Sequence, residues 1–273
     1  MLRQRIITAA ILLAVLLPSI FLFDPWVWGA VTLLFLAAAA REWTQLLGHP
    51  RSAWLAALAL GVVGLGLLAW QHVHGWPPYL ISAASWLACL VWLTLGPLHL
   101  RRGDARGGGW PLAAFLLLAC WLALVALRER GVAPLLAAMA IIWVADVAAY
   151  FVGRALGRRK LAPSISPGKS WEGAIGGFVA VAIVGLLAAG LPALADTLPA
   201  RLVVEWGPVA AALVLVGIAA LSILGDLHES LLKRQAGVKD SGTLLPGHGG
   251  VLDRIDALIP TMPAAVLLHQ LLG

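Results

Sequence analysis

The chain has 273 residues, of which 61% are hydrophobic and 12% charged, with a formal net charge of +6. A soluble domain carries about 25% charged residues, so this composition excludes an ordinary soluble protein and predicts that much of the surface faces lipid. In a membrane protein, basic cytoplasmic loops explain the positive charge better than nucleic-acid binding does, and no nucleic-acid partner is expected.

A transmembrane helix needs about 20 apolar residues. No strand-like alternation typical of a barrel is present, so helices are the expected form. The first apolar run is interpreted as a permanent span and not as a signal peptide. The fold class is therefore all-α, a polytopic integral membrane protein with about nine transmembrane helices. The predicted spans are 6–23, 26–40, 53–70, 79–96, 110–127, 132–153, 173–191, 207–225 and 252–272.

The basic residues test the number and direction of these spans. If the N-terminus is cytoplasmic, sixteen Lys and Arg fall in cytoplasmic segments and three on the opposite side. This bias follows the positive-inside rule, so it favours a cytoplasmic N-terminus and places the loops around Lys169 and Lys239 in the cytoplasm. We expect a multi-pass protein of the cell's inner (cytoplasmic) membrane.

Charge also divides the chain along its length. No Asp, Glu, Lys or Arg occurs between Arg51 and Arg101, whereas seven of the thirteen acidic residues lie on the predicted cytoplasmic side from Asp146 onward. We predict that residues 1–130 form an N-terminal scaffold of transmembrane helices. Residues 131–273 then form a catalytic transmembrane region, with its motif at 226–256 and its active site facing the cytoplasm.

Asp146 lies deep in the sixth apolar segment. An ionisable group inside a span is costly and faces protein or water, not lipid. Tyr150 and Arg154 follow at intervals of four residues on the same face. Two interpretations stay open: a structural pair between Asp146 and Arg154, or a carboxylate in a polar cavity that opens toward the C-terminal motif.

The loop 161–173 combines turn residues, hydroxyls and a lysine. Ser166, Pro167 and Gly168 predict a turn, and Ser170 is suited to cap the following helix. Lys169 and the hydroxyls suit a phosphate. Taken alone, an ordinary basic loop explains the pattern at least as well.

The segment 226–256 concentrates carboxylates, lysine and glycine next to the membrane. If the eighth helix continues past the membrane, Asp226, Ser230 and Lys233 share one face. Asp253 and Asp256, three residues apart, share a face of the next helix. Glycine-rich backbone before them can approach phosphate closely. Because carboxylates hold Mg²⁺ that is shared with substrate phosphates, the segment predicts a metal-dependent phosphate site.

Histidine and cysteine offer no zinc site. His248 has no second histidine at metal-ligand spacing, so a hydrogen-bonded turn residue is the favoured interpretation. Cys89 and Cys120 lie inside apolar runs without CxxC spacing, which is typical of small core residues.

The run from 230 to 256 resembles the motif of the phosphatidate cytidylyltransferases, also called CDP-diacylglycerol synthases. The run 166–173 resembles a second element of that family, with Gly168 where the family often has a basic residue and Ser170 where it has Thr. The first half of the chain resembles the family only as a set of apolar spans. The motif positions are Ser230, Lys233, Arg234, Lys239, Asp240, Gly242, Leu245, Pro246, His248, Gly249, Gly250, Asp253, Arg254 and Asp256.

The resemblance implies transfer of a cytidylyl group from CTP to phosphatidate, forming CDP-diacylglycerol and pyrophosphate in phospholipid biosynthesis. It also implies Mg²⁺ with a monovalent cation such as K⁺, and a homodimer. The implied metal ligands are Asp226 and Asp253, followed by Asp256 and Asp146. The implied catalytic residues are Asp226, Lys233, Lys239, Asp240, Asp253 and Asp256. The implied substrate-binding residues are Ser166, Lys169, Ser170, Glu172, Ser230, Arg234, His248, Gly249, Gly250 and Arg254.

Two other functions compete with this one. A CDP-alcohol phosphatidyltransferase requires an Asp-Gly-x-x-Ala-Arg run, which the chain lacks. A secondary transporter would use Asp146 and Asp226 as ion sites, but it would not require the neighbouring glycine-rich turn or the Lys and Arg set. A third alternative is a related enzyme of the same family that acts on a different lipid phosphate.

Overall fold

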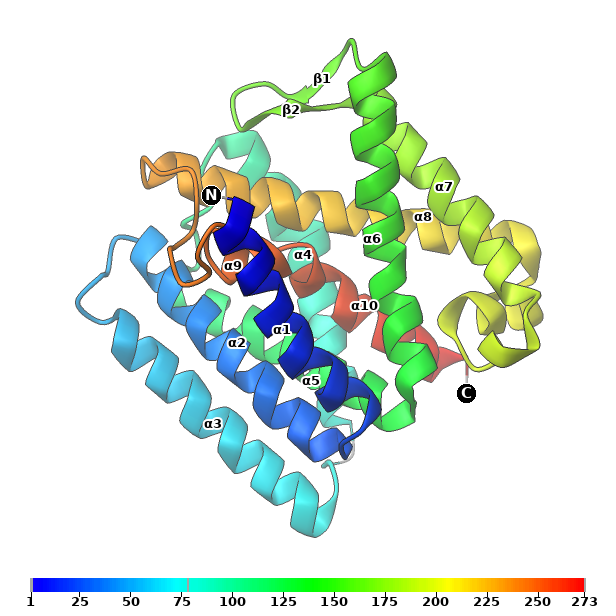
Figure 1. Ribbon diagram of the computed structural model, residues 1–273, viewed down its shortest axis with the longest axis horizontal. Helices are drawn as coiled ribbons and strands as arrows, with labels where there is room; N and C mark the ends of the chain where they lie inside the picture. Colours follow the sequence, from blue (N-terminus) through cyan, green and yellow to red (C-terminus); the bar gives the residue numbers. More distant parts are fainter. Residues whose placement is uncertain (1, 78, 273) are drawn as a thin grey trace.

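A computed structural model describes residues 2–77 and 79–272 of the chain, which are predominantly helical (Figure 1). One short β-hairpin interrupts the helices between α6 and α7. In chain order the elements are α1 (Leu2–Phe21), α2 (Pro25–Leu46), α3 (Ala53–His74), α4 (Leu80–Arg102), α5 (Gly109–Arg130), α6 (Val132–Leu156), β1 (Lys160–Ala162), β2 (Ser166–Ser170), α7 (Trp171–Ala189), the 3-10 turn η1 (Pro192–Leu194), α8 (Leu198–Gln235), α9 (Leu252–Ile255) and α10 (Leu258–Leu271).

The all-α polytopic class is confirmed. Seven helices of the described chain are long and apolar enough to cross a membrane, namely α1 and α3 to α8. Each of the first eight predicted spans coincides with a long helix and the ninth with α9 and α10, but α2 and α10 do not meet that criterion. α2 carries Arg41 and Glu42 within its length, and α10 has only 14 residues. The prediction of nine spans is therefore supported for seven.

Several predicted boundaries were wrong for identifiable reasons. α2 continues past residue 40 to Leu46, because Arg41 and Glu42 interrupt the apolar run without breaking the helix. α8 has 38 residues and bends at Gly207, whose φ of 79° departs from helical geometry just before Pro208. α8 continues beyond the predicted span, to Gln235, which meets the condition under which Asp226, Ser230 and Lys233 share one face. The predicted ninth span divides into α9 and α10.

Close packing of α6 against α7 depends on glycine. A Cβ at Gly173 would lie 2.8 Å from the carbonyl oxygen of Ala149, and one at Gly177 would lie 2.8 Å from that of Ala145. Small residues four apart let helix backbones approach in this way in membranes. The two helices are thereby held together at the end of α6 that carries Asp146 and Arg154.

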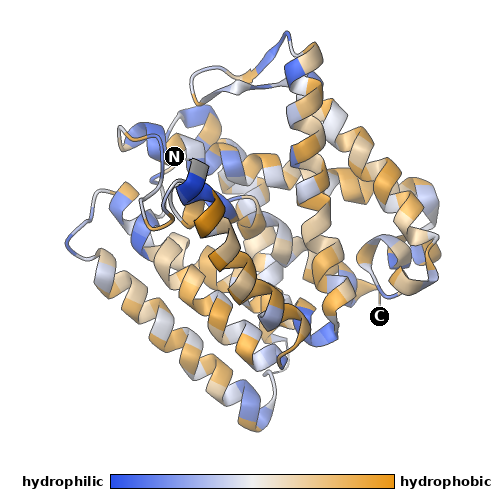
Figure 2. Cartoon of the chain, viewed as in Figure 1, coloured by the Kyte–Doolittle hydropathy of each residue, from blue (hydrophilic) through white to orange (hydrophobic). Residues whose placement is uncertain are grey.

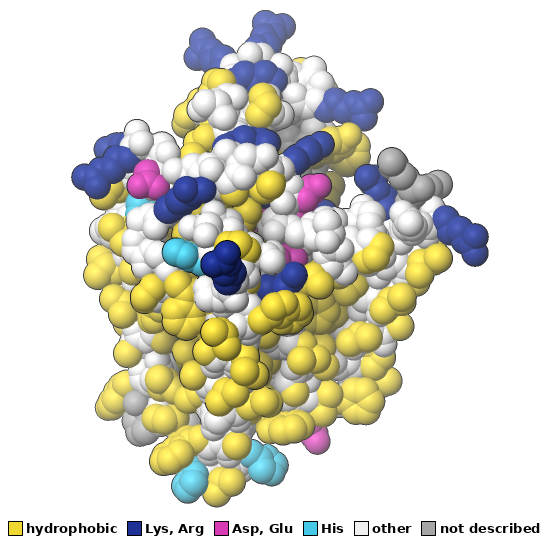
Figure 3. Space-filling view, turned by 90° about the vertical axis from the view of Figure 1, so that its left-hand side faces the viewer, with side chains coloured by type: hydrophobic (Ala, Val, Ile, Leu, Met, Phe, Trp, Pro, Cys, Tyr) yellow, Lys and Arg dark blue, Asp and Glu magenta, His cyan; other side chains and the backbone are white. Residues whose placement is uncertain are grey.

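The surface follows a membrane pattern. Apolar side chains cover most of the helices, while hydrophilic residues gather at the hairpin, at the connection between α2 and α3, and at helix ends (Figure 2). Seen from the side, Lys and Arg cluster at one end of the molecule above a broad apolar surface (Figure 3). Two buried hydrogen bonds connect α2 to α5. Trp28 Nε1 donates to Leu124 O (3.1 Å), and Trp121 Nε1 donates to Gly29 O (2.9 Å).

Candidate active site

A cavity of about 400 Å³ lies where α6, α7, α8 and the β-hairpin meet. It has both charged and apolar walls, which suits a ligand with a charged group and an apolar body. The predicted polar face of α6 is part of it. The charged or hydrogen-bonding side chains in its lining are Asp146, Tyr150, Arg154, Lys169, Ser170 and Asp226.

Lys169 and Asp226 form an ion pair across this cavity. The Nζ atom of Lys169, on β2, lies 2.5 Å from Oδ2 of Asp226, on α8. Their side chains are about one quarter to one third exposed, so both remain accessible from the cavity. The other oxygen of Asp226, Oδ1, accepts a hydrogen bond from Ser230 Oγ at 3.2 Å, one helical turn along. The prediction that Asp226 and Ser230 share a face is therefore confirmed.

Asp146 lies in the cavity without the structural partner that one interpretation gave it. Among the described residues, Asp146 forms no ion pair with Arg154. Arg154 Nη1 instead donates to Tyr150 Oη at 3.2 Å. The carboxylate is within range of the charges of Lys169 and Asp226. This arrangement favours the polar-cavity interpretation over the structural pair.

The hairpin that carries Lys169 differs from the predicted turn. Its turn occupies residues 163–165, and Ser166 already begins β2, because Lys160 pairs with Ser170 and Ala162 with Ser166. Ser170 caps α7 as predicted, accepting from Gly173 N at 3.2 Å.

Glu172 also supports the hairpin, because it accepts from the backbone N–H groups of Arg158 and Arg159. Glu172 therefore fixes the base of the hairpin, and Ser166 lies within its pairing. Neither is among the residues that line the cavity.

A second charged cluster lies farther along α8. Lys233 Nζ is 2.5 Å from Glu229 Oε2 and 2.7 Å from Asp253 Oδ1. Less than one seventh of each of these three side chains is exposed. Two buried carboxylates therefore share one ammonium group. This shared pairing places Lys233 at the centre of the cluster.

Asp253 is the most fully hydrogen-bonded carboxylate of the motif. Its Oδ2 accepts from Ser241 N (2.9 Å), Ser241 Oγ (3.0 Å) and Gly250 N (2.8 Å). Burial by itself raises the pKa of Asp253, but the hydrogen bonds from Lys233 and from these backbone groups outweigh it and lower the pKa to about 2. Asp253 is therefore ionised throughout the physiological pH range.

Asp256, directly after α9, is partly buried and within range of the charge of Asp226. Burial raises the pKa of Asp256, and the charge of Asp226 raises it further. Its Oδ1 accepts from Ala257 N at 2.8 Å. A group in this position needs nearby positive charge to remain ionised. Asp226 and Asp256 are thus two acidic groups whose mutual repulsion favours a bound cation.

The glycine-rich turn is folded largely on itself. Gly247 and Gly249 adopt φ of 77° and 82°, the left-handed region that favours glycine. The N–H of His248 donates to Leu245 O, and that of Gly250 donates to Asp253 Oδ2. These two N–H groups are therefore engaged within the protein. The predicted use of this turn as a phosphate cradle remains a prediction.

The remaining predicted residues lie around the turn and at the end of α8. Arg254 Nε and Nη2 donate to the carbonyl oxygen of His248, at 3.1 and 2.5 Å. Arg234 Nε donates to Ile165 O at 3.2 Å and so connects α8 to the hairpin. Lys239 and Asp240 are exposed in the loop after α8. The structure therefore gathers most of the predicted set at one end of the molecule, in two clusters along α8.

Three residues of this region were missed from the sequence. Glu229 was not assigned a site role, although its spacing of three from Asp226 and four from Lys233 placed it on the same face. Ser241 lay inside the motif between recognised positions. Glu42 fell just outside a predicted span, in the half of the chain regarded as scaffold. A carboxylate in an otherwise apolar helix was the available signal for Glu42.

The carboxylates fit a divalent cation that substrate phosphates help to hold. Within the described residues, no three His, Cys, Asp or Glu side chains converge as a complete metal cluster. Mg²⁺, however, is usually held by one or two protein carboxylates together with phosphates. The ammonium group of Lys169 lies beside Asp226, and that of Lys233 lies beside Asp253. Both carboxylates therefore already attract positive charge.

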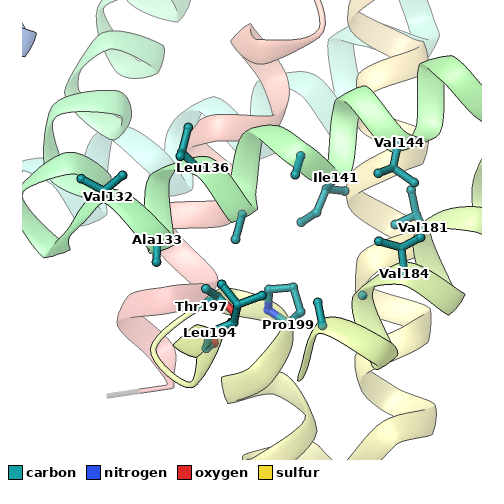
Figure 4. Close-up of a pocket in the computed structure, with 14 residues that line it drawn as sticks. Val132, Ala133, Leu136, Ile141, Val144, Val181, Val184, Leu194, Thr197 and Pro199 are labelled. Carbon is teal, nitrogen blue, oxygen red and sulfur yellow. Dashed lines mark hydrogen bonds between the residues drawn. The ribbon is translucent and has the colours of Figure 1, made fainter. Parts of the chain in front are cut away.

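A larger cavity, of about 530 Å³, has different chemistry. It lies between α6, α7 and the segment 194–199, and Thr197 is its single polar side chain (Figure 4). Val144 lines this cavity and Asp146 lines the polar one; residues two apart on a helix do not face the same way. The apolar cavity therefore lies on another face of α6 and has no charged side chain for a phosphate.

Comparison with known proteins places the chain in a family. Residues 3–272 match the Cytidylyltransferase family. The phosphatidate cytidylyltransferase of Pseudomonas aeruginosa is 41% identical, over 98% of this chain and 97% of that protein. The chain belongs to the cytidylyltransferase family. The phosphatidate cytidylyltransferases of Haemophilus influenzae and Brucella suis are 36% and 39% identical, and each covers at least 96% of this chain. The family predicted from the motif is thus confirmed, and cytidylyltransferase membership favours an enzyme over a transporter.

Proposed function

We propose that this chain is a phosphatidate cytidylyltransferase, which transfers the cytidylyl group of CTP to phosphatidate and releases pyrophosphate. A phosphate oxygen of the lipid attacks the α-phosphorus of CTP, and the bond from that phosphorus to the β-phosphate oxygen breaks. The observation that carries the proposal is the cavity lined by Asp146, Lys169 and Asp226 on a chain whose full-length relatives bear that name.

The cavity provides what phosphoryl chemistry needs. Transfer at phosphorus depends mainly on positioning and on stabilising charge. Lys169 and Arg154 line the cavity as cationic groups for phosphate oxygens, with the apolar walls of α6 and α8 beside them. Lys233 pairs with both Glu229 and Asp253, which keeps the second cluster compact next to α9.

Mg²⁺ is the proposed cofactor, with a monovalent cation such as K⁺. Asp226 and Asp253 are the proposed ligands, with Asp256 and Asp146 close to them. When bound, Mg²⁺ neutralises charge that develops on the phosphates. Asp226 already holds one positive group on the cavity side, the ammonium group of Lys169. A cation that binds in the cavity takes the place of that ammonium group.

The proposed setting is the inner membrane, with the N-terminus and the site in the cytoplasm and the protein as a homodimer. CTP is a cytoplasmic metabolite in this scheme, and the lipid arrives from the bilayer. The concentration of basic side chains at the end of the molecule that carries the hairpin supports this orientation.

This orientation predicts a labelling pattern. Lys239→Cys lies in an exposed loop beside the site, and Asp196→Cys lies in an exposed segment after α7. Both native cysteines are buried. A membrane-impermeant thiol reagent added to intact cells should label position 196 and not position 239. Labelling of position 239 alone would reverse the orientation.

Lys169→Ala is expected to raise the KM for a phosphate-bearing substrate by about tenfold or more, since a charge-assisted hydrogen bond contributes roughly 1.5–3 kcal/mol. The effect on kcat should be smaller if the contact is made equally in the ground and transition states. Lys160→Ala is the matched control, because Lys160 is exposed on the same hairpin and does not line the cavity. Steady-state kinetics with an unchanged KM would remove Lys169 from phosphate binding.

Asp146→Asn tests the carboxylate inside the membrane. Because Asp146 does not pair with Arg154, the variant should fold with normal yield and show a lower kcat. Asp196→Asn, exposed and far along the chain, is the control. Detergent-extracted yield and kcat are measured for both variants. Loss of folded protein with unchanged kcat would return Asp146 to a structural role.

A panel of lipid phosphates tests the proposed function. Purified protein is incubated with α-labelled CTP and Mg²⁺, together with phosphatidate, lysophosphatidate or an isoprenoid phosphate. Phosphatidate should give the most labelled lipid and a matching amount of pyrophosphate. Preference for another lipid phosphate would assign a different acceptor, and no product from any of them would contradict the proposal.

A further inference from the structure

Glu42, from the N-terminal half of the chain, is buried against the loop that carries the motif. Its side chain on α2 is fully buried, with 0% exposed. The Oε2 atom accepts from Ser241 Oγ at 3.1 Å and from Leu252 N at 2.8 Å, and Oε1 accepts from Val251 N at 3.2 Å. All three donors belong to residues 241–252, the segment immediately before Asp253.

Two motif glycines leave the space that this carboxylate fills. A Cβ on Gly242 would collide with the Oε1 atom of Glu42, and one on Gly250 would lie 2.5 Å from its Oε2 atom. Gly242 does not have a positive φ, so its backbone would accept another residue. Contact with Glu42 is therefore the reason for glycine at position 242.

The same contact reaches Asp253 through Ser241. The hydroxyl of Ser241 lies 3.1 Å from the Glu42 carboxylate and 3.0 Å from that of Asp253, and it accepts from the Asp253 N–H at 3.2 Å. A hydroxyl has one proton, so it donates to one carboxylate at a time. Ser241 is thus shared between the two acidic groups.

Because Glu42 is buried, its hydrogen bonds depend on the position of the loop 241–252. No cation lies within ion-pair distance of Glu42 in the described part of the chain. A buried charge without partners is strongly unfavourable, and here the loop supplies the donors. If the loop moves away, Glu42 loses those donors. The closed loop is therefore favoured over open conformations.

We infer that Glu42 is a positioning residue for cytidylyl transfer, holding the loop 241–252 so that Asp253 stays against Lys233. Glu42 contacts neither the cavity nor Asp253 directly, so it acts through the loop. The inference rests on the proposed function for its kinetic readout. It also implies that the N-terminal half contributes to the active site, beyond its role as scaffold.

Two variants disturb the contact from opposite sides. Glu42→Gln keeps the shape but turns an amide donor toward N–H groups, and Gly242→Ala places a methyl group against the carboxylate. Each should lower kcat by about 10- to 100-fold, the range for residues that orient ligands through a hydrogen bond. Hydrogen exchange should become at least several-fold faster in residues 241–253 and stay unchanged in α5. Glu42→Asp, which keeps the charge, should recover part of the activity.

Matched controls separate positioning from packing. Thr44→Val alters another buried polar residue of α2, whose hydroxyl donates within the helix to Ala40 O. Gly217→Ala adds a methyl group where nothing lies within 4 Å. Both should keep the wild-type kcat and the wild-type exchange in residues 241–253.

The outcomes are distinct. Unchanged exchange in residues 241–253 for both Glu42→Gln and Gly242→Ala would overturn the inference, and so would a normal kcat in both. Uniformly faster exchange throughout the protein, without rescue by Glu42→Asp, would reduce Glu42 to a packing residue and also overturn it. If the proposed function is wrong, the wild-type protein gives no product. The exchange measurement then still decides whether Glu42 holds residues 241–253 in place.

Discussion

Asp253→Asn is expected to lower turnover by about a thousandfold while leaving the protein folded, the scale seen when one group that stabilises transition-state charge is removed. The asparagine side chain keeps the shape of the carboxylate, but it carries no charge and cannot accept at both ends. Fold is retained because Lys233 still has Glu229 as a partner, 2.5 Å away. Turnover in detergent and elution on size-exclusion chromatography are measured together.

The control for this variant is Asp24→Asn, which changes an exposed carboxylate that makes no side-chain cap to α2. Its turnover should match that of the wild type. Turnover of Asp253→Asn within a fewfold of the control would remove Asp253 from the catalytic set, whatever its effect on stability.

Lys233→Met is expected to cost about 3–5 kcal/mol of stability, because it leaves the carboxylates of Glu229 and Asp253 buried without their shared cation. The variant should also be inactive. A thermal-shift measurement in detergent checks the stability, with Arg101→Met as the control, since that side chain is exposed near the end of α4.

A double variant separates the two effects of Lys233. Adding Glu229→Gln replaces one of the two buried acidic groups that lose their partner, so Lys233→Met/Glu229→Gln should recover part of the lost Tm. It should not recover turnover, because the ammonium group is still missing. Equal Tm values for Lys233→Met and the wild type would show that the cluster is solvated and contributes little to stability.

The residues found from the sequence were those whose chemistry is unusual where they occur. A carboxylate in an apolar helix predicted the polar face of Asp146, and helical spacing predicted that Asp226 and Ser230 share a face. Ser170 was recognised as a cap because its hydroxyl precedes a clear helix. In each case the evidence lay within a few residues along the chain.

What the sequence could not predict depends on contacts between distant segments. The ion pair between Lys169 and Asp226 joins residues 57 positions apart, and the contact between Glu42 and Leu252 joins residues 210 apart. The position of the hairpin turn was also wrong, because strand pairing and not local turn preference sets it. Helix ends such as that of α2 were misplaced for a related reason, since burial of Glu42 by the loop removes the apparent cost of its charge.

The most direct test of the proposed activity is stoichiometric product formation by purified protein. The protein is reconstituted in phosphatidate-containing vesicles with α-labelled CTP and Mg²⁺, alongside Asp253→Asn prepared in the same way. The wild type should form labelled CDP-diacylglycerol and pyrophosphate in equal amounts, and the variant should form no more than background. Wild-type protein that is folded and inserted but forms neither product, or equal product from both proteins, would contradict it.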